Sequence, residues 1–295
     1  MTIEIAHGVG PDKLDIAYET LGDPANPPLL LIMGLGAQLI TWPDGFCDEL
    51  VQRGRYVIRF DNRDAGESTH MTNAPAPNYP AALAGDFSSV SYTLSNMAAD
   101  AAGLLDHLNI PAADIVGASL GGFVAQTLAI EHRARVKTLT SIMSSTGDRT
   151  VGQPHPVSAQ IFALGQPTNR DQAAERAIAI NKLIGSPGFP VDPEYLAERA
   201  RRLYDRSSEP MGIIRQAMAT LASGDRTPKL KQLELRTLVI HGDADALVDV
   251  SGGRATAAAI AGSKLMIIPG MGHDLPKPLW AQFAGAVTDL VTGNG

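Results

Sequence analysis

Residues 117–121 read Gly-Ala-Ser-Leu-Gly, which places one serine between two glycines in a Gly-x-Ser-x-Gly pattern. Residues 114–116 indicate the end of a short buried strand, and residues 123–131 follow a helical pattern. A serine held between a strand and a helix lies on a sharp turn that exposes its hydroxyl. A structural serine that caps the helix is the alternative, and a chain with 29 glycines carries chance copies of the pattern. The strand–turn–helix context favours Ser119 as a nucleophile.

The backbone around Ser119 also suits this chemistry. Gly117 and Gly121 lie where a Cβ atom would collide with neighbouring backbone in so tight a turn. The N–H group of Leu120 stands at the start of the helix, where backbone donors have no partner within the helix and can bind an anion.

A serine hydroxyl is a poor nucleophile without a base, and histidine is the side chain whose pKa suits that task near neutral pH. The chain has seven histidines. Three lie in turn-rich segments, and His107 and His132 lie on predicted helices. His241 ends a predicted strand, and His273 lies in a loop after the last one. Because sites in open α/β sheets form at the carboxyl ends of strands, the pattern favours His273 and leaves His241 as a rival.

The base in turn needs a carboxylate that fixes its tautomer and stabilises the imidazolium. Three aspartates follow predicted strands: Asp243 and Asp245 after one strand, and Asp148 after the strand before it. The residues alone leave all three open as the acid.

A charge-dense segment, residues 61–64 (Asp-Asn-Arg-Asp), also follows a predicted strand. We expect a loop held together by salt bridges and hydrogen bonds. A substrate-binding Arg63 is the alternative.

Composition restricts the class of protein. The chain has 295 residues, of which 44% are hydrophobic and 19% charged, as in ordinary globular proteins. Its net charge of −7 argues against nucleic acid as a partner, because phosphate binding needs a basic face. The same charge gives no attraction to anionic membranes. We therefore expect a small-molecule partner and a monomer or homodimer.

The single cysteine, Cys47, excludes an intramolecular disulfide and a cysteine zinc cluster, and it is expected to be a small apolar filler on a helix. The first residues show no basic segment followed by an apolar run, so no signal peptide is expected. No apolar run approaches the length of about 18 residues that a membrane span needs. A cytoplasmic location is the expectation.

Strands and helices that could position the candidate residues alternate along the chain, which predicts a parallel sheet covered by helices on both faces. The expected strands are residues 2–6, 14–20, 29–33, 56–60, 114–116, 136–143, 237–241 and 264–268. The expected helices are residues 43–53, 94–108 with Ser95 as N-cap, 123–131, 253–260 and 279–290.

The alternation breaks between the sixth and seventh strands. Residues 146–230 contain helical patterns interrupted by glycine and proline and no convincing strand. We interpret this segment as a helical cap inserted into a core domain of residues 1–145 and 231–295. The alternative is that these helices simply extend the helical layer of the core.

The chain resembles the α/β-hydrolase superfamily. In particular it resembles the bacterial serine esterase/lipase branch that includes aclacinomycin methylesterase, and the haloperoxidase-like esterases. The chain order of serine, aspartate and histidine is also that of this superfamily. The matching segments are Leu31-Ile32-Met33-Gly34-Leu35-Gly36, Asp61-Asn62-Arg63-Asp64-Ala65-Gly66-Glu67-Ser68, Gly117-Ala118-Ser119-Leu120-Gly121-Gly122, His241-Gly242-Asp243-Ala244-Asp245 and Gly270-Met271-Gly272-His273.

The resemblance implies a mostly parallel eight-stranded sheet with a helical cap after the sixth strand. It implies Ser119, Asp245 and His273 as the catalytic residues, and the backbone amides of Leu35 and Leu120 as the oxyanion hole. Many relatives have His-Gly where this chain has Met33-Gly34. Because the donor there is a backbone amide, the difference need not remove the oxyanion hole.

The resulting hypothesis is a serine carboxylic ester hydrolase that works through an acyl-enzyme and needs neither cofactor nor metal. A C–C bond hydrolase or a cofactor-free perhydrolase could use the same residues. A non-catalytic small-molecule receptor is the alternative from another class of protein.

Overall fold

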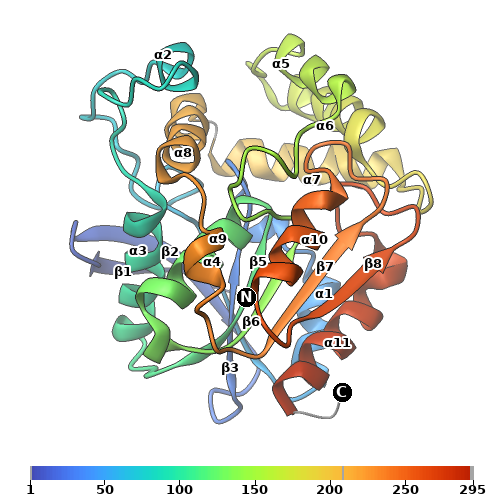
Figure 1. Cartoon of the computed structure of the whole chain (residues 1–295). Coiled ribbons are helices and arrows are strands. Elements are labelled where there is room, and N and C mark those ends of the chain that lie inside the picture. Colours follow the sequence, from blue (N-terminus) through green and yellow to red (C-terminus); the bar gives the residue numbers. More distant parts are fainter. Residues whose placement is uncertain (1, 208, 293–295) are drawn as a thin grey trace.

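Eight strands form a single sheet at the centre of the computed structural model, which describes residues 2–207 and 209–292 (Figure 1). The strands are β1 (Glu4–Val9), β2 (Leu14–Leu21), β3 (Pro28–Ile32), β4 (Tyr56–Phe60), β5 (Ala113–Ala118), β6 (Val136–Ile142), β7 (Thr237–Gly242) and β8 (Lys264–Ile268). Their order across the sheet is β1-β2-β4-β3-β5-β6-β7-β8. β2 pairs antiparallel with β1 and β4, and the remaining neighbours are parallel. This confirms the predicted mostly parallel eight-stranded sheet.

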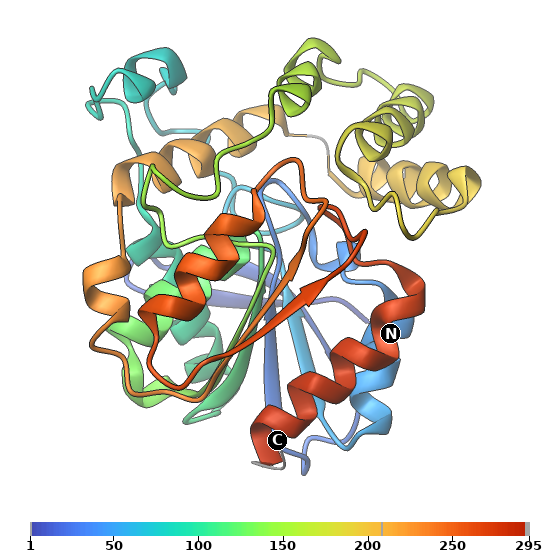
Figure 2. The same cartoon turned by 45° about the vertical axis from the view of Figure 1, so that its right-hand side comes forward.

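Helices cover both faces of the sheet, so its central strands are apolar on both sides. Leu30 and Ile32 of β3 face one core, which includes residues of α3 and α4. Leu29 and Leu31 face the other core, against α1 and α11. Figure 2 shows α1 and α11 side by side on that second face. The helices outside the segment between β6 and β7 are η1 (Leu39–Thr41), α1 (Asp44–Gln52), α2 (Tyr79–Leu83), α3 (Leu94–His107), α4 (Leu120–Glu131), η2 (Arg133–Arg135), α10 (Val250–Ala259), η4 (Lys277–Leu279) and α11 (Trp280–Thr292).

Two local expectations were tested by these helices. Cys47 is buried on α1, as predicted for an apolar filler. The predicted N-cap Ser95 was wrong: the N-cap of α3 is Thr93, whose N–H donates to Asn96 Oδ1. Ser95 lies inside the helix, where its hydroxyl donates to Glu131.

The segment between β6 and β7 is helical, as the sequence pattern indicates. Its helices are η3 (Pro156–Ala159), α5 (Gln160–Ala163), α6 (Arg170–Ile184), α7 (Pro193–Arg206), α8 (Pro210–Ser223) and α9 (Thr227–Leu230). Side chains of Asn169, Asp192 and Glu209 accept hydrogen bonds from the first amides of α6, α7 and α8, which fixes where these helices begin.

In space this segment lies over the ends of the strands. Figures 1 and 2 show α5, α6, α7 and α8 above the carboxyl ends of the parallel strands, with α6 packed along α7. The short α9 instead packs against α4 and α10 beside the sheet. The division into a core of residues 1–145 and 231–295 and a cap of residues 146–230 stays a prediction. Within the described residues, no helix has the length and hydropathy that crossing a membrane would require.

Candidate active site

Ser119 occupies the turn between β5 and α4. Its backbone has φ 55° and ψ −121°, a conformation that costs free energy in a residue other than glycine. The Ser119 N–H donates to the carbonyl oxygen of Ile142 at the end of β6, at 2.9 Å, which ties the turn to the sheet. The strained turn projects the serine from the carboxyl end of the parallel strands, as the strand–turn–helix pattern predicts.

The glycines on either side of Ser119 have a steric role. A Cβ atom on Gly117 would overlap the carbonyl oxygen of Gly121, and one on Gly121 would overlap that of Ile32. Both obstacles are backbone atoms of sheet or helix, so neither can move aside as a flexible side chain could.

Replacing Gly121 with alanine is therefore expected to lower the free energy of unfolding by about 3 kcal/mol, since the methyl group has no space beside β3. Urea denaturation followed by circular dichroism would measure this loss. Gly285→Ala is the matched control. Gly285 lies in α11 with no atom within 4 Å of an added Cβ, so alanine should be neutral or stabilising by up to about 1 kcal/mol. Equal stability of the two variants would contradict the steric account.

His273 lies beside Ser119, in the loop that follows β8. Its Nε2 is 3.0 Å from Ser119 Oγ, and its side chain is only 9% exposed. The His273 backbone N–H donates to the carbonyl oxygen of Ile184 at the end of α6, at 2.7 Å. The histidine is thus held from two sides, by the loop after β8 and by the helical segment above it.

Asp245 follows β7 and completes the arrangement. Its Oδ2 is 2.7 Å from His273 Nδ1, and its Oδ1 accepts the N–H groups of Leu247 and Val248 at 2.9 Å each. Burial alone would raise the pKa of Asp245. The charge of His273 and the hydrogen bonds from His241, His273 and Val248 outweigh burial and lower the pKa well below its usual range. The carboxylate therefore stays ionised beside the imidazole.

The other acid candidates lie elsewhere. Asp243 Oδ1 accepts the N–H of Gly270 at 2.7 Å, which ties together the loops after β7 and β8. Asp148 instead accepts the N–H and hydroxyl of Thr150. The rival base, His241, is fully buried behind the carboxylate. Its Nε2 lies 2.8 Å from the carbonyl oxygen of Val248 and 3.5 Å from Asp245 Oδ2.

Two backbone N–H groups lie next to residues in contact with Ser119 or beside it in the chain. Gly34 lies against the serine, because a Cβ atom on it would stand 3.2 Å from the Ser119 Cβ. The next N–H along the chain is that of Leu35, and the N–H of Leu120 begins α4 on the other side. Among the residues that the structure describes, neither N–H group has a hydrogen-bond acceptor. Both are available to a negatively charged oxygen.

The side chains that hold the Leu35 loop are not among the residues that the sequence motifs indicate as catalytic. Asn62 Nδ2 donates to the carbonyl oxygen of Met33 at 3.0 Å, and Gln216 Oε1 accepts the N–H of Gly36 at 2.8 Å. Asn62 was noticed only as part of a charged run. Gln216 carries no sequence signal, since it is one polar residue on a helix 180 positions away from Gly36.

Arg63 is buried among carboxylates, which argues against the alternative that it binds substrate. It is 1% exposed, and its guanidinium binds Asp100 at 2.6 and 2.7 Å and Asp12 at 2.9 Å. Residues 61–64 form the salt-bridged loop that the composition of the segment predicts.

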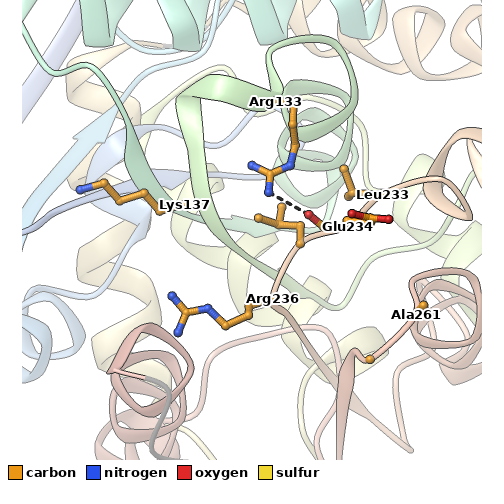
Figure 3. Close-up of a pocket in the computed structure, with 8 residues that line it drawn as sticks. Arg133, Lys137, Leu233, Glu234, Arg236 and Ala261 are labelled. Atoms are coloured by element: carbon orange, nitrogen blue, oxygen red, sulfur yellow. Dashed lines mark hydrogen bonds between the residues drawn. The ribbon is translucent and has the colours of Figure 1, made fainter.

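A surface pocket of about 490 Å³ lies at the other end of the sheet (Figure 3). It is lined by Arg133, Lys137, Leu233, Glu234, Leu235, Arg236, Ala261 and Gly262. These residues lie near the amino-terminal ends of β6 and β7, whereas Ser119, Asp245 and His273 follow the carboxyl ends of their strands. Within the described residues, no three His, Cys, Asp or Glu side chains gather as a metal site would require.

The profile of the family described as the alpha/beta hydrolase fold matches residues 27–276. Rhodomycin D methylesterase of Streptomyces peucetius is 30% identical over 295 residues, covering 94% of each chain.

Solved structures agree with the family match. A hydrolase from Pseudomonas aeruginosa has a TM-score of 0.69 and 25% identity, covering 99% of this chain and 97% of that one. An esterase from Rhodococcus sp. has a TM-score of 0.75 and 22% identity over the whole of both chains, which shows the shared fold.

Proposed function

The chain belongs to the alpha/beta hydrolase fold family, in its bacterial esterase branch, and on this premise we propose that it hydrolyses carboxylic esters with Ser119 as nucleophile. The observation that carries the proposal is the position of His273. Its two ring nitrogens lie 3.0 Å from the Ser119 hydroxyl and 2.7 Å from the Asp245 carboxylate. One imidazole can therefore take a proton from the serine while the carboxylate stabilises the resulting charge.

In the first half of the reaction, Ser119 Oγ attacks the ester carbonyl as His273 Nε2 accepts its proton. The carbonyl oxygen becomes an oxyanion that accepts the N–H groups of Leu35 and Leu120. Each such donor contributes about 3–4 kcal/mol to lowering the barrier. The tetrahedral intermediate then collapses, His273 protonates the departing alcohol, and the acyl group remains on Ser119.

In the second half, a water molecule takes the place of the alcohol. His273 removes its proton, and the hydroxide adds to the acyl carbonyl. The oxyanion forms again between the same two amides. Collapse expels Ser119 Oγ, which recovers its proton from His273, and the carboxylic acid leaves. Neither half requires a cofactor or metal.

The helical segment of residues 146–230 and the name of a relative both bear on the choice of substrate. We assign this segment as a cap over an apolar pocket that sets the preference for acyl and alcohol groups. The name of the 30% identical relative, a methylesterase, makes methyl esters the first substrates to test.

The net charge of −7 supports a small molecule, and not nucleic acid, as the partner. We further propose that the chain is a monomer or homodimer and lies in the cytoplasm, where its single cysteine stays reduced.

The experiment is a substrate panel with stopped-flow detection. p-Nitrophenyl esters of two to eight acyl carbons should give a burst of p-nitrophenol equal to the enzyme concentration, followed by turnover at about 1–1,000 s⁻¹. Methyl esters followed by acid release should also be hydrolysed. Tight ester binding with neither a burst nor turnover would instead indicate a receptor. Faster consumption of esters with hydrogen peroxide than with water as acceptor would indicate a perhydrolase.

A further inference from the structure

The conformation of the loop that carries the Leu35 N–H depends on contacts with other parts of the chain. Residues 34–37 form a turn in which the Ala37 N–H donates to the carbonyl oxygen of Gly34 at 3.1 Å, and Gly36 has a φ of +63°. The Leu35 side chain is 45% exposed, so burial of that side chain provides little anchoring. The orientation of the Leu35 peptide must therefore depend on contacts to its backbone.

Gln216 on α8 supplies one of these contacts and is fully buried. Its Oε1 accepts the N–H of Gly36 at 2.8 Å, and its Nε2 donates to the carbonyl oxygen of Arg63 at 2.7 Å. The orientation of the amide is fixed, because an N–H requires an acceptor and a carbonyl requires a donor. One side chain thus joins the loop after β3 to the loop after β4.

The position of α8 is fixed by other contacts to the same loops. Arg215, the neighbour of Gln216, binds both oxygens of the buried Asp64 at 2.8 and 2.7 Å. Tyr92 donates its hydroxyl to Asp64 at 2.7 Å. A Cβ atom on Gly36 would overlap the side chain of Ile213, one turn before Gln216. The helix therefore lies directly on the Leu35 loop, with Gln216 directed at it.

We propose that Gln216 is a positioning residue of the oxyanion hole. By holding the Gly36 N–H against a fixed helix, it sets the direction of the adjacent Leu35 N–H toward the carbonyl oxygen of the substrate. Such donors act only when they are held within about 0.5 Å of the productive geometry. The rate of catalysis then depends on the position of α8 against the loop of residues 34–37. This inference rests on the proposed function, because it assumes that Leu35 donates to the oxyanion.

The test is Gln216→Met, which keeps the size of the side chain and removes both hydrogen bonds. We expect kcat for p-nitrophenyl acetate to fall about 10–100-fold, less than the loss of a whole donor, while KM changes less than about threefold. Affinity for a trifluoromethyl ketone, whose adduct with Ser119 carries an oxyanion, should fall by the same factor as kcat/KM. Affinity for the product carboxylate should hardly change.

Gln126→Met is the matched control. Gln126 is also a fully buried glutamine, and its amide bonds to Ser141 and Arg226 and not to the Leu35 loop. This variant should lose a similar amount of stability and keep its kcat. Gln216→Glu gives a second variant. It keeps the acceptor for Gly36, and once the carboxyl ionises it sets an oxygen against the Arg63 carbonyl, so kcat should fall as rising pH ionises the carboxyl.

The outcomes separate the two claims. Wild-type kcat and inhibitor affinity in folded Gln216→Met would overturn the positioning role alone. An equal fall of kcat in Gln126→Met would also overturn it, because the effect would then be general loosening. Turnover that survives the loss of the Ser119 hydroxyl would overturn the proposed function itself.

Discussion

Ser119→Ala is expected to lower kcat for ester hydrolysis by about 10⁴–10⁶-fold, which removes turnover at ordinary enzyme concentrations. The substitution deletes the atom that would form the acyl-enzyme. It keeps the Cβ and leaves the elbow glycines and the bond from the Ser119 N–H to Ile142 unchanged. Because only the half-buried hydroxyl and its contact with His273 are lost, the variant should fold as well as the parent protein. Stopped-flow measurement with p-nitrophenyl acetate would give both the burst and the steady-state rate.

Labelling with a fluorophosphonate gives an independent readout of the same residue. The parent protein should gain one phosphonyl group on Ser119, as seen by intact mass and peptide mapping, and the alanine variant should gain none. Ser263→Ala is the control, because the Ser263 hydroxyl donates to the carbonyl oxygen of Ala257 near the end of α10. A parent protein that is well folded and unlabelled would exclude Ser119 as a nucleophile.

Asp245→Asn is expected to lower kcat by about 10⁴-fold while leaving the fold intact. The N–H groups of Leu247 and Val248 require an acceptor, so the asparagine oxygen must face them. Its NH₂ group then faces His273 Nδ1, which becomes an acceptor. The proton moves to Nε2, the nitrogen that should take the proton of Ser119. The variant would hold its histidine in place in the wrong tautomer.

Asp243→Asn provides the matched control for this prediction. Asp243 lies two residues away, but it accepts the N–H of Gly270, a bond that an asparagine oxygen can keep. Its kcat should stay within about twofold of the parent value, as for most exposed substitutions. If the two variants lost activity equally, Asp245 would have no special role.

Since the pKa of Asp245 is held below its usual range, its protonation should not contribute to loss of activity in mildly acidic solution.

Local patterns were enough to predict most of the sheet and its covering helices. The continuous apolar run of residues 29–33 coincides with β3, a buried strand parallel to both of its neighbours, because each side of such a strand meets a helical layer. Element ends were less accurate. The helix expected to begin at residue 123 begins at Leu120, because the glycines that ordinarily oppose helix formation are required here by close packing against β3 and the end of β6.

The sequence by itself determined which residue types were available and where the chain would bend. Gly-x-Ser-x-Gly between strand and helix points to Ser119, and the resemblance to a family assigns partners to it. Spacing alone could not choose between Asp243 and Asp245, because both follow the same strand, and it favoured His273 without excluding His241.

Only the tertiary structure decided which of these side chains meet. Residues 119 and 273 are separated by 154 positions, and their 3.0 Å approach depends on how β5, β7 and β8 are placed in the sheet. The same holds for Gln216, whose bond to Gly36 exists because α8 is seated on the loop after β3. Hydrogen bonds depend on distances of a few ångströms, and a sequence pattern carries periodicity but no such distances.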